Sequence, residues 1–105
     1  MIERQWGAYA DHLRTDTCVF KTLYIFAGRS TSLQRHNHRS EVWFVSDGTV
    51  RVEIGDEVHY GGAGSSFTIP CGVWHRLTAV QTDVVMREMQ FGTLCSEDDI
   101  ERKPS

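Results

Sequence analysis

Short β-rich segments recur along the chain, and residues typical of turns separate them. Apolar and polar residues alternate cleanly through residues 49–54, and the Gly55-Asp56 pair that follows predicts a tight hairpin into the next segment. Strands repeated at intervals of about 8–12 residues predict an all-β sandwich or barrel. The predicted strands span residues 18–27, 33–38, 41–46, 49–54, 57–60, 66–69, 74–79 and 83–91.

The length of the chain limits how many cores it can build. It has 105 residues, of which 40% are hydrophobic, and this suits a single domain, 1–105, with one core. We expect an N-terminal arm over residues 1–17, extended or partly helical, and a barrel over residues 18–95. The charged tail, residues 96–105, is expected to fray at its end.

Charge and composition exclude several classes of partner. A net charge of -3 without long runs of one sign argues against nucleic acid as a partner. We expect neither a signal peptide nor a membrane span, because no apolar stretch approaches the roughly 18–20 residues that a span requires. The three cysteines are odd in number and widely spaced, which favours reduced thiols in a cytoplasmic protein.

A cluster of possible metal ligands begins in the second predicted strand. Gln34, His36 and His38 fall on alternate positions, so the three side chains share one face of a strand. Glu41 follows after a short turn and opens the next strand. Amide, imidazole and carboxylate groups together suit one divalent ion such as Zn, Mn, Fe, Co or Ni, and do not resemble an all-thiolate zinc site.

A second segment supplies a further candidate ligand. Pro70 and Gly72 predict a turn that returns the chain to the barrel, and His75 then begins a strand. A lone histidine would most simply be a polar residue of the barrel. The joint pattern of the two segments favours a shared metal site instead.

Together these segments resemble the two motifs of the cupin superfamily, the first of which is Gly, five residues, His-x-His, three or four residues, Glu, six residues, Gly. Placing His36 and His38 on the His-x-His pair leaves one residue too few before Glu41. Placing Gln34 and His36 there fits every spacing from Gly28 to Gly48 without a gap. We favour this second alignment, which leaves His38 as an inward-facing neighbour or alternative ligand. The resemblance then implies a metal site formed by Gln34, His36, Glu41 and His75, in a double-stranded β-helix or jelly-roll barrel.

At a finer level the chain is similar to the isomerase domain of type II phosphomannose isomerases, which often stands at the C-terminus of bifunctional mannose-1-phosphate guanylyltransferases. Ala79 departs from this pattern, where the family usually has Asn. The resemblance implies metal-dependent interconversion of mannose 6-phosphate and fructose 6-phosphate through a cis-enediolate. The matching motifs are Arg4 to Tyr9 (with Gln5 replacing Pro), Ser32 to Trp43, Ile69 to Leu77 and Glu97 to Arg102.

Such a reaction needs a base that carries a proton between two carbons and positive charge for the phosphate. We rank His38 ahead of Glu88 as the proton carrier. Arg39, Arg76 and Arg29 lie beside motif residues and can donate paired hydrogen bonds to a small sugar phosphate.

Outward apolar side chains such as Phe20 and Phe44 would leave an apolar surface on a monomer of this size, so we expect a homodimer. Two other functions stay open. The chain could act on another sugar or small acid, or it could be a non-catalytic module that binds sugar or metal.

Overall fold

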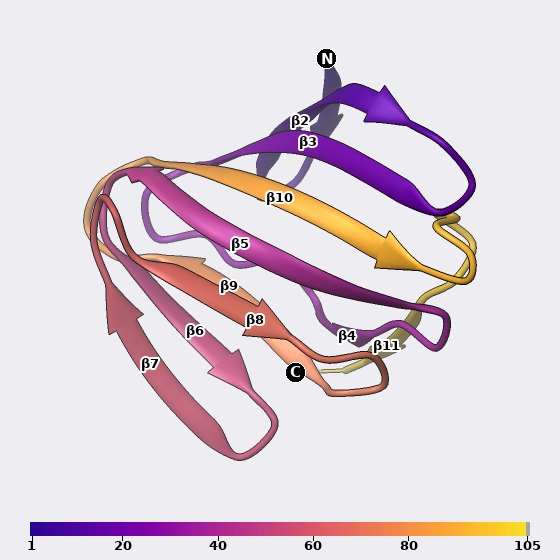
Figure 1. The fold of residues 1–105 in the computed structure, drawn as a ribbon. Coiled ribbons are helices and arrows are strands. Elements are labelled where there is room, and N and C mark those ends of the chain that lie inside the picture. The colour runs from indigo at the N-terminus through magenta and orange to yellow at the C-terminus, as the bar shows by residue number, and fades with distance from the viewer. Residues whose placement is uncertain (105) are drawn as a thin grey trace.

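The computed structural model describes residues 1–104, which form strands and no helix. Nowhere among these residues is there a helix of the length and apolarity needed to cross a membrane. The strands lie in two facing sheets (Figure 1), so the all-β prediction is confirmed. They are β1 (Ile2–Arg4), β2 (Gly7–Arg14), β3 (Cys18–Ile25), β4 (Leu33–Arg35), β5 (Arg39–Asp47), β6 (Val50–Ile54), β7 (Glu57–Gly61), β8 (Ser66–Ile69), β9 (His75–Ala79), β10 (Val84–Gly92) and β11 (Glu101–Lys103).

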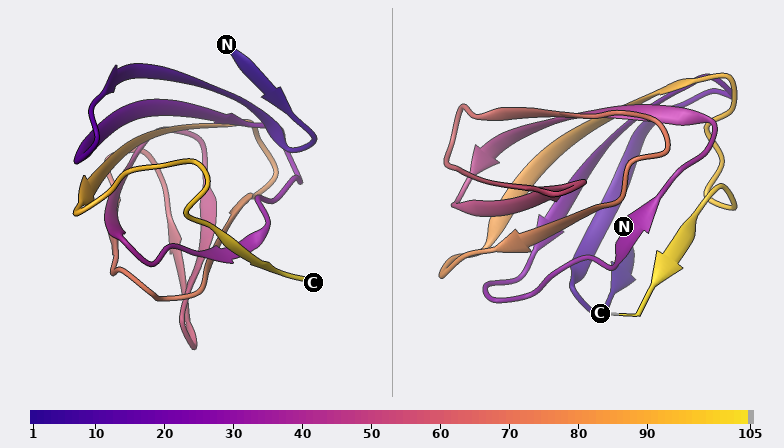
Figure 2. Two further views of the ribbon diagram at one scale, coloured as in Figure 1. Left: turned by 90° about the vertical axis from the view of Figure 1, so that its right-hand side faces the viewer. Right: turned by 90° about the horizontal axis from the view of Figure 1, so that it is seen from below.

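The two sheets interleave strands that are distant in the sequence. The larger has six strands in the order β1-β2-β3-β10-β5-β8, and the smaller has five in the order β11-β4-β9-β6-β7. Every pairing is antiparallel. Strand β10 lies between β3 and β5, so the larger sheet is complete only when the last long strand is in place. The C-terminal segment then crosses one end of the molecule to reach the smaller sheet (Figure 2).

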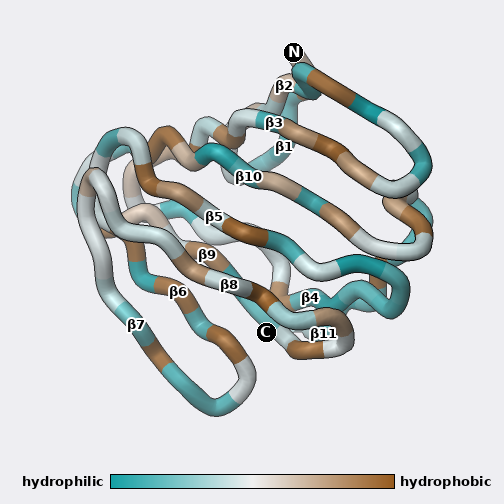
Figure 3. The backbone as a smooth tube through the Cα atoms, viewed as in Figure 1, coloured by the Kyte–Doolittle hydropathy of each residue, from teal (hydrophilic) through white to brown (hydrophobic). Residues whose placement is uncertain are grey.

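Alternation along the strands divides the interior into an apolar end and a polar end. On β5 the inward positions change from Val45 and Trp43 to Glu41 and then Arg39, and all four side chains are buried. On β10 they change in the same direction, from valine and methionine to Glu88 and Gln90. Figure 3 shows this mixture of brown and teal along the central strands. Neighbouring strands carry their polar residues in matching register, so these residues together form a polar site at one end of the interior.

Both ends of the chain contribute strands to the sheets. The expected arm, residues 1–17, contains β1 and β2; β1 pairs with β2, and β2 pairs with β3. This pairing covers the edge that β3 would otherwise expose. In the expected tail, β11 pairs with β4, and only Ser105 lies outside the described residues. The predicted strand over residues 33–38 ends at Arg35, which changes the direction of the side chains that follow.

Candidate metal centre

Three of the predicted ligands meet between the sheets at the polar end. His36 follows β4, Glu41 lies in β5 and His75 opens β9, so both sheets contribute. One ligand atom from each residue lies within 4.8 Å of the other two, and all three side chains are buried. The indole Nε1 of Trp43 donates to Glu41 Oε1 (2.9 Å) and so fixes the orientation of this carboxylate.

The turn that presents His75 depends on Gly72. Its φ of 82° lies in the left-handed region, where a side chain is strained. The Gly72 N–H donates to the His36 carbonyl (2.7 Å), which ties the two histidine-bearing segments together. The Pro-x-Gly turn therefore positions His75 relative to His36 as the sequence predicts.

Hydrogen bonds fix the tautomer of both imidazoles. His36 Nδ1 donates to the carbonyl of Asp99 (2.7 Å), and His75 Nδ1 donates to the carbonyl of Val73 (2.9 Å). Each Nε2 is then the atom that carries the free lone pair. Burial, together with the charge of Arg39, lowers the pKa of His36 to about 4, and burial also lowers the pKa of His75. Both rings are neutral near pH 7, as metal ligands must be.

A divalent cation fits this set of donors. His75 Nε2 is buried and has no hydrogen-bond partner among residues 1–104, which is costly for a polar atom unless something binds it. His36 Nε2 lies 3.3 Å from Glu41 Oε2. Because His36 is neutral, this contact gains little as an ion pair. Two imidazole nitrogens and one carboxylate are donors that Zn, Mn, Fe, Co and Ni accept.

Gln34, the fourth predicted ligand, lies beside the cluster of His36, Glu41 and His75. It is directly opposite His75 in the β4–β9 pairing, and it lines a cavity together with His36 and Glu41. Its Oε1 accepts a hydrogen bond from Ser32 Oγ (3.1 Å). A second lone pair of this oxygen is available for a cation.

Arg39 brings a buried positive charge directly to the cluster. Its Nε donates to Glu41 Oε2 (3.0 Å), and its Nη2 lies 3.3 Å from His36 Nε2. Its Nη1 donates to the carbonyl of Ser96 (2.8 Å). A cation bound to His36 requires Nη2 to turn away, whereas the bond to Ser96 can persist.

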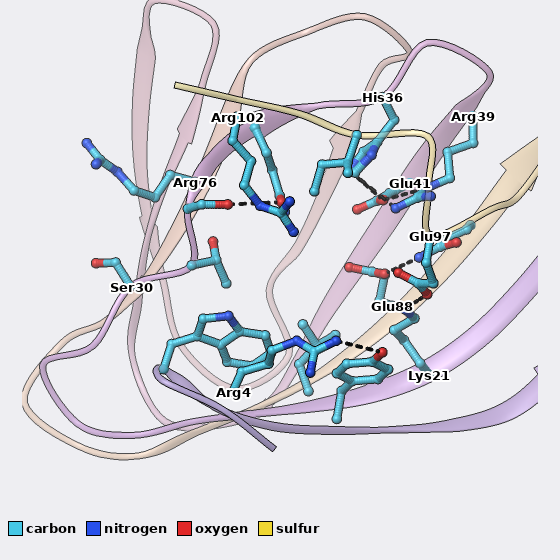
Figure 4. A pocket seen from close by; sticks show the side chains of 18 of the residues that line it. Arg4, Lys21, Ser30, His36, Arg39, Glu41, Arg76, Glu88, Glu97 and Arg102 are labelled. Atoms are coloured by element: carbon cyan, nitrogen blue, oxygen red, sulfur yellow. Dashed lines mark hydrogen bonds and ion pairs between the residues drawn. The ribbon is translucent and has the colours of Figure 1, made fainter. Parts of the chain in front are cut away.

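Two members of the cluster, His36 and Glu41, form part of the wall of a cavity of about 490 Å³, a size suited to a small organic ligand (Figure 4). Glu88 is buried in this wall and lies between Glu41 and Lys21 in the figure. It accepts a hydrogen bond from Gln90 Nε2 (2.7 Å). Burial, with repulsion from Glu41, raises the pKa of Glu88 to about 7. This carboxyl group can therefore accept and release a proton near neutral pH.

The C-terminal segment closes one side of the cavity. Glu97 accepts a hydrogen bond from the buried Lys21 (2.8 Å). The carboxylate of Asp99 accepts from the backbone N–H groups of Asn37 and His38 (both 2.9 Å), next to its carbonyl bond with His36.

Sequence reasoning missed Lys21 and Glu97. A signal existed for Lys21, because it alternates with the inward apolar residues of β3.

Three predicted functional residues do not join the cluster. His38 is exposed in a bend beyond β4 and lines a separate depression that also includes Cys71 and Phe91. Arg29 is exposed and does not line the main cavity. Arg76 touches the rim of the cavity, but alternation along β9 turns it away from the face that carries His75. There it donates two hydrogen bonds to Glu53 (2.6 and 3.0 Å).

Comparison with proteins of known sequence gives a consistent result. The family described as "Mannose-6-phosphate isomerase C-terminal" matches residues 1–104. The xanthan biosynthesis protein XanB of Xanthomonas campestris is 38% identical over 102 residues, which are 96% of this chain and 22% of that protein. The mannose-1-phosphate guanylyltransferase ManC of Salmonella typhimurium is 34% identical over 104 residues, covering 96% and 21%. The chain thus spans about a fifth of the length of these relatives.

Solved structures establish the fold at low sequence identity. A double-stranded β-helix protein from Klebsiella pneumoniae has a TM-score of 0.83 at 14% identity, covering 100% of this chain and 90% of the other. The cupin domain of Schizosaccharomyces pombe Cnp3 has a TM-score of 0.80 at 12% identity, covering 85% and 66%. The chain therefore has the cupin fold and belongs to the family of mannose-6-phosphate isomerase C-terminal domains.

Proposed function

We propose that this chain is a metal-dependent aldose–ketose isomerase that interconverts mannose 6-phosphate and fructose 6-phosphate. The observation that carries the proposal is the orphaned Nε2 of His75, which lies close to a neutral His36 and the carboxylate of Glu41, and these two side chains line the cavity. The family to which the chain belongs supports the choice of substrate.

In this proposal one divalent metal is held by His36, Glu41 and His75, with Gln34 as the fourth ligand. When bound, the metal would stabilise negative charge on the sugar oxygens as a Lewis acid. Zn, Mn, Co, Ni and Fe all suit the donor set, and the assay below distinguishes among them.

Glu88 is the proton carrier in this scheme, ahead of His38. It lines the cavity, whereas His38 lies in a different depression. The Glu88 carboxylate takes the proton from C2 of the aldose and returns it to C1, while a hydroxyl proton passes from O2 to O1. Arg39 donates hydrogen bonds to these oxygens as negative charge develops on them. Lys21 donates its hydrogen bond to Glu97, and its charge offsets part of the rise in the pKa of Glu88.

The proposal also includes a homodimer. Phe44, Met89 and Phe91 are exposed on the outer face of the larger sheet, and adjacent strands place these side chains close together. Met89 lies opposite Phe20 in the pairing of β10 with β3, which extends the apolar area. An apolar sheet face of this kind suits an isologous contact between two copies.

The test measures sugar-phosphate exchange and metal content on the same purified chain. We expect exchange to disappear after chelation and to return with one or more of the five cations. Glu41→Ala combined with His75→Ala should lose both metal and exchange, whereas His59→Ala should lose neither, because His59 is exposed on β7.

Two outcomes contradict parts of the proposal. Stoichiometric metal in the Glu41→Ala/His75→Ala variant would refute the metal site. Full metal occupancy without exchange would refute the isomerase and indicate another substrate or a binding role.

A further inference from the structure

The charges that line the cavity are mostly paired. Five cationic side chains contribute to its wall, and three of them have a carboxylate partner. These pairs are Lys21 with Glu97 (2.8 Å), Arg39 with Glu41 (3.0 Å) and Arg76 with Glu53 (2.6 Å). The other two are Arg4 and Arg102. Within residues 1–104, neither of these forms an ion pair with a carboxylate.

Arg4 and Arg102 come from opposite ends of the chain and from different sheets. Arg4 ends β1, and Arg102 lies in the middle of β11. Figure 4 shows the two side chains reaching into the cavity from opposite sides. They therefore face the same space without being adjacent in the sequence.

Neighbouring groups set the position of each arginine. Arg4 Nη2 donates a long hydrogen bond to the hydroxyl of Tyr9 (3.4 Å), and its guanidinium lies 5.3 Å from the centre of that ring. Arg102 is directly opposite Gln34 in the pairing of β11 with β4. Directly opposite residues place their side chains on the same face of a sheet. Arg102 thus extends from beside a proposed metal ligand toward the mouth of the cavity.

We propose that Arg4 and Arg102 form an anion subsite that binds the phosphoryl group of the substrate, an assignment that rests on the proposed function. A phosphate monoester carries about two negative charges at pH 7, because its second pKa is about 6. Two guanidinium groups without carboxylate partners match that charge and present planar pairs of donors to its oxygens. The sugar carbons then extend toward Glu88 and the metal centre.

This assignment replaces the arginines expected from the sequence. Arg76 already donates two hydrogen bonds, from Nε and Nη2, to Glu53, and Arg29 lies outside the cavity. Binding phosphate at Arg76 would require the ion pair with Glu53 to break, whereas Arg4 and Arg102 need to break none.

The test titrates the full chain with inorganic phosphate by calorimetry, both as purified and after chelation, so that phosphate bound to a metal is recognised. We expect Arg4→Ala and Arg102→Ala each to raise the Kd for phosphate about 10-fold or more, since each removes a charged hydrogen-bond donor. Arg29→Ala is the matched control, because it removes an exposed arginine from outside the cavity. Thermal melting verifies that each variant is folded, and Arg102→Gln provides a second variant with a long side chain.

Kinetics give an independent readout. In the double variant, which combines Arg4→Ala with Arg102→Ala, KM for mannose 6-phosphate should rise more than 10-fold. The change in kcat should be much smaller, because the phosphate lies away from the reacting carbons. Phosphate binding unchanged in the double variant, or weakened equally by Arg29→Ala, would overturn the subsite. The wild type could show no sugar-phosphate exchange while phosphate binding is lost in the double variant and kept in Arg29→Ala. That result would refute the isomerase and leave the phosphate subsite standing.

Discussion

Glu88 has surroundings that make its proton easy to move at neutral pH. If it carries the proton, Glu88→Gln should lower kcat by about 10²–10⁴-fold, the usual contribution of a general base. Metal content should stay the same, because Glu88 is not among the proposed ligands. Glu57→Gln, an exposed change on β7, is the control.

The pH profile tests the same residue in the wild type. The pKa of Glu88 is raised to about 7, and the base form is the one that accepts the carbon-bound proton. We therefore expect kcat/KM to fall as the pH drops through about 7. A full loss of exchange in His38→Ala, with Glu88→Gln still active, would reverse our ranking of the two proton carriers.

In the metal-free protein, His36 and Glu88 change the unfolding free energy in opposite directions as the pH changes. The pKa of His36 falls on folding from 6.5 to about 4, so its contribution is present above pH 6.5 and is lost as the pH falls toward 4. The pKa of Glu88 rises from 4.5 to about 7, so its contribution is present below pH 4.5 and is lost as the pH rises through 7. The two effects largely cancel between pH 4.5 and 6.5.

Glu88→Gln should reveal the histidine effect. We expect this variant, after chelation, to lose about 2 kcal/mol or more of unfolding free energy between pH 6.5 and pH 5. Each pH unit is worth about 1.4 kcal/mol for one extra proton bound by the unfolded state, and His75, whose pKa burial also lowers, adds a loss of the same sign to that of His36. Urea unfolding at several pH values measures it. The slope should shrink when His36→Gln is added, and an unchanged slope would rule out His36 as its source.

Spacing in the sequence was enough to find three side chains that lie close together in the structure. His36, Glu41 and His75 follow from motif spacing alone, and the structure brings them together. Lys21 and Glu97 could not be paired in the same way. They lie 76 positions apart, and only the course of the C-terminal segment makes them neighbours.

At the level of secondary structure, the main error lies in where one strand ends. The alternation that put His38 on the face of Gln34 and His36 assumes a strand through residue 38, but β4 ends at Arg35. Asp99 accepts hydrogen bonds from the N–H groups of two residues in the following bend. A bend stabilised by a residue more than 60 positions away leaves no local signal. The hairpin between β6 and β7, in contrast, depends on local turn residues and was predicted closely.

We predict that the C-terminal segment supports the proposed metal centre through Asp99. We expect Asp99→Ala to weaken zinc binding about 10-fold, because the loosened segment no longer presents its carbonyl firmly to His36 Nδ1, and such outer contacts typically contribute 10–100-fold to affinity. Competition with a chromogenic chelator measures the affinity. Asp98→Ala is the control, since it changes a neighbouring acid that does not contact this bend. Equal affinities in the two variants would show that the segment has no such role.

For the molecule as a whole, we predict that the outer face of the larger sheet holds two copies together. Sedimentation equilibrium of the wild type should give twice the chain mass of 12.0 kDa. Phe44→Glu should shift the mass toward one chain without unfolding it, because Phe44 is 45% exposed. Val58→Glu is the control, as Val58 is similarly exposed but lies on the smaller sheet. A wild type that sediments as a single chain contradicts the dimer.

The three proposed ligands come from both sheets, and this has a consequence for how the protein unfolds. Glu41 belongs to the larger sheet, whereas His75 belongs to the smaller one. A cation shared between them is a cross-link that must break before the sheets can separate. At a free concentration 100 times its Kd, such a ligand adds about 2.7 kcal/mol to the unfolding free energy. The order of melting temperatures across a series of cations would then rank their affinities for the chain, with no substrate present.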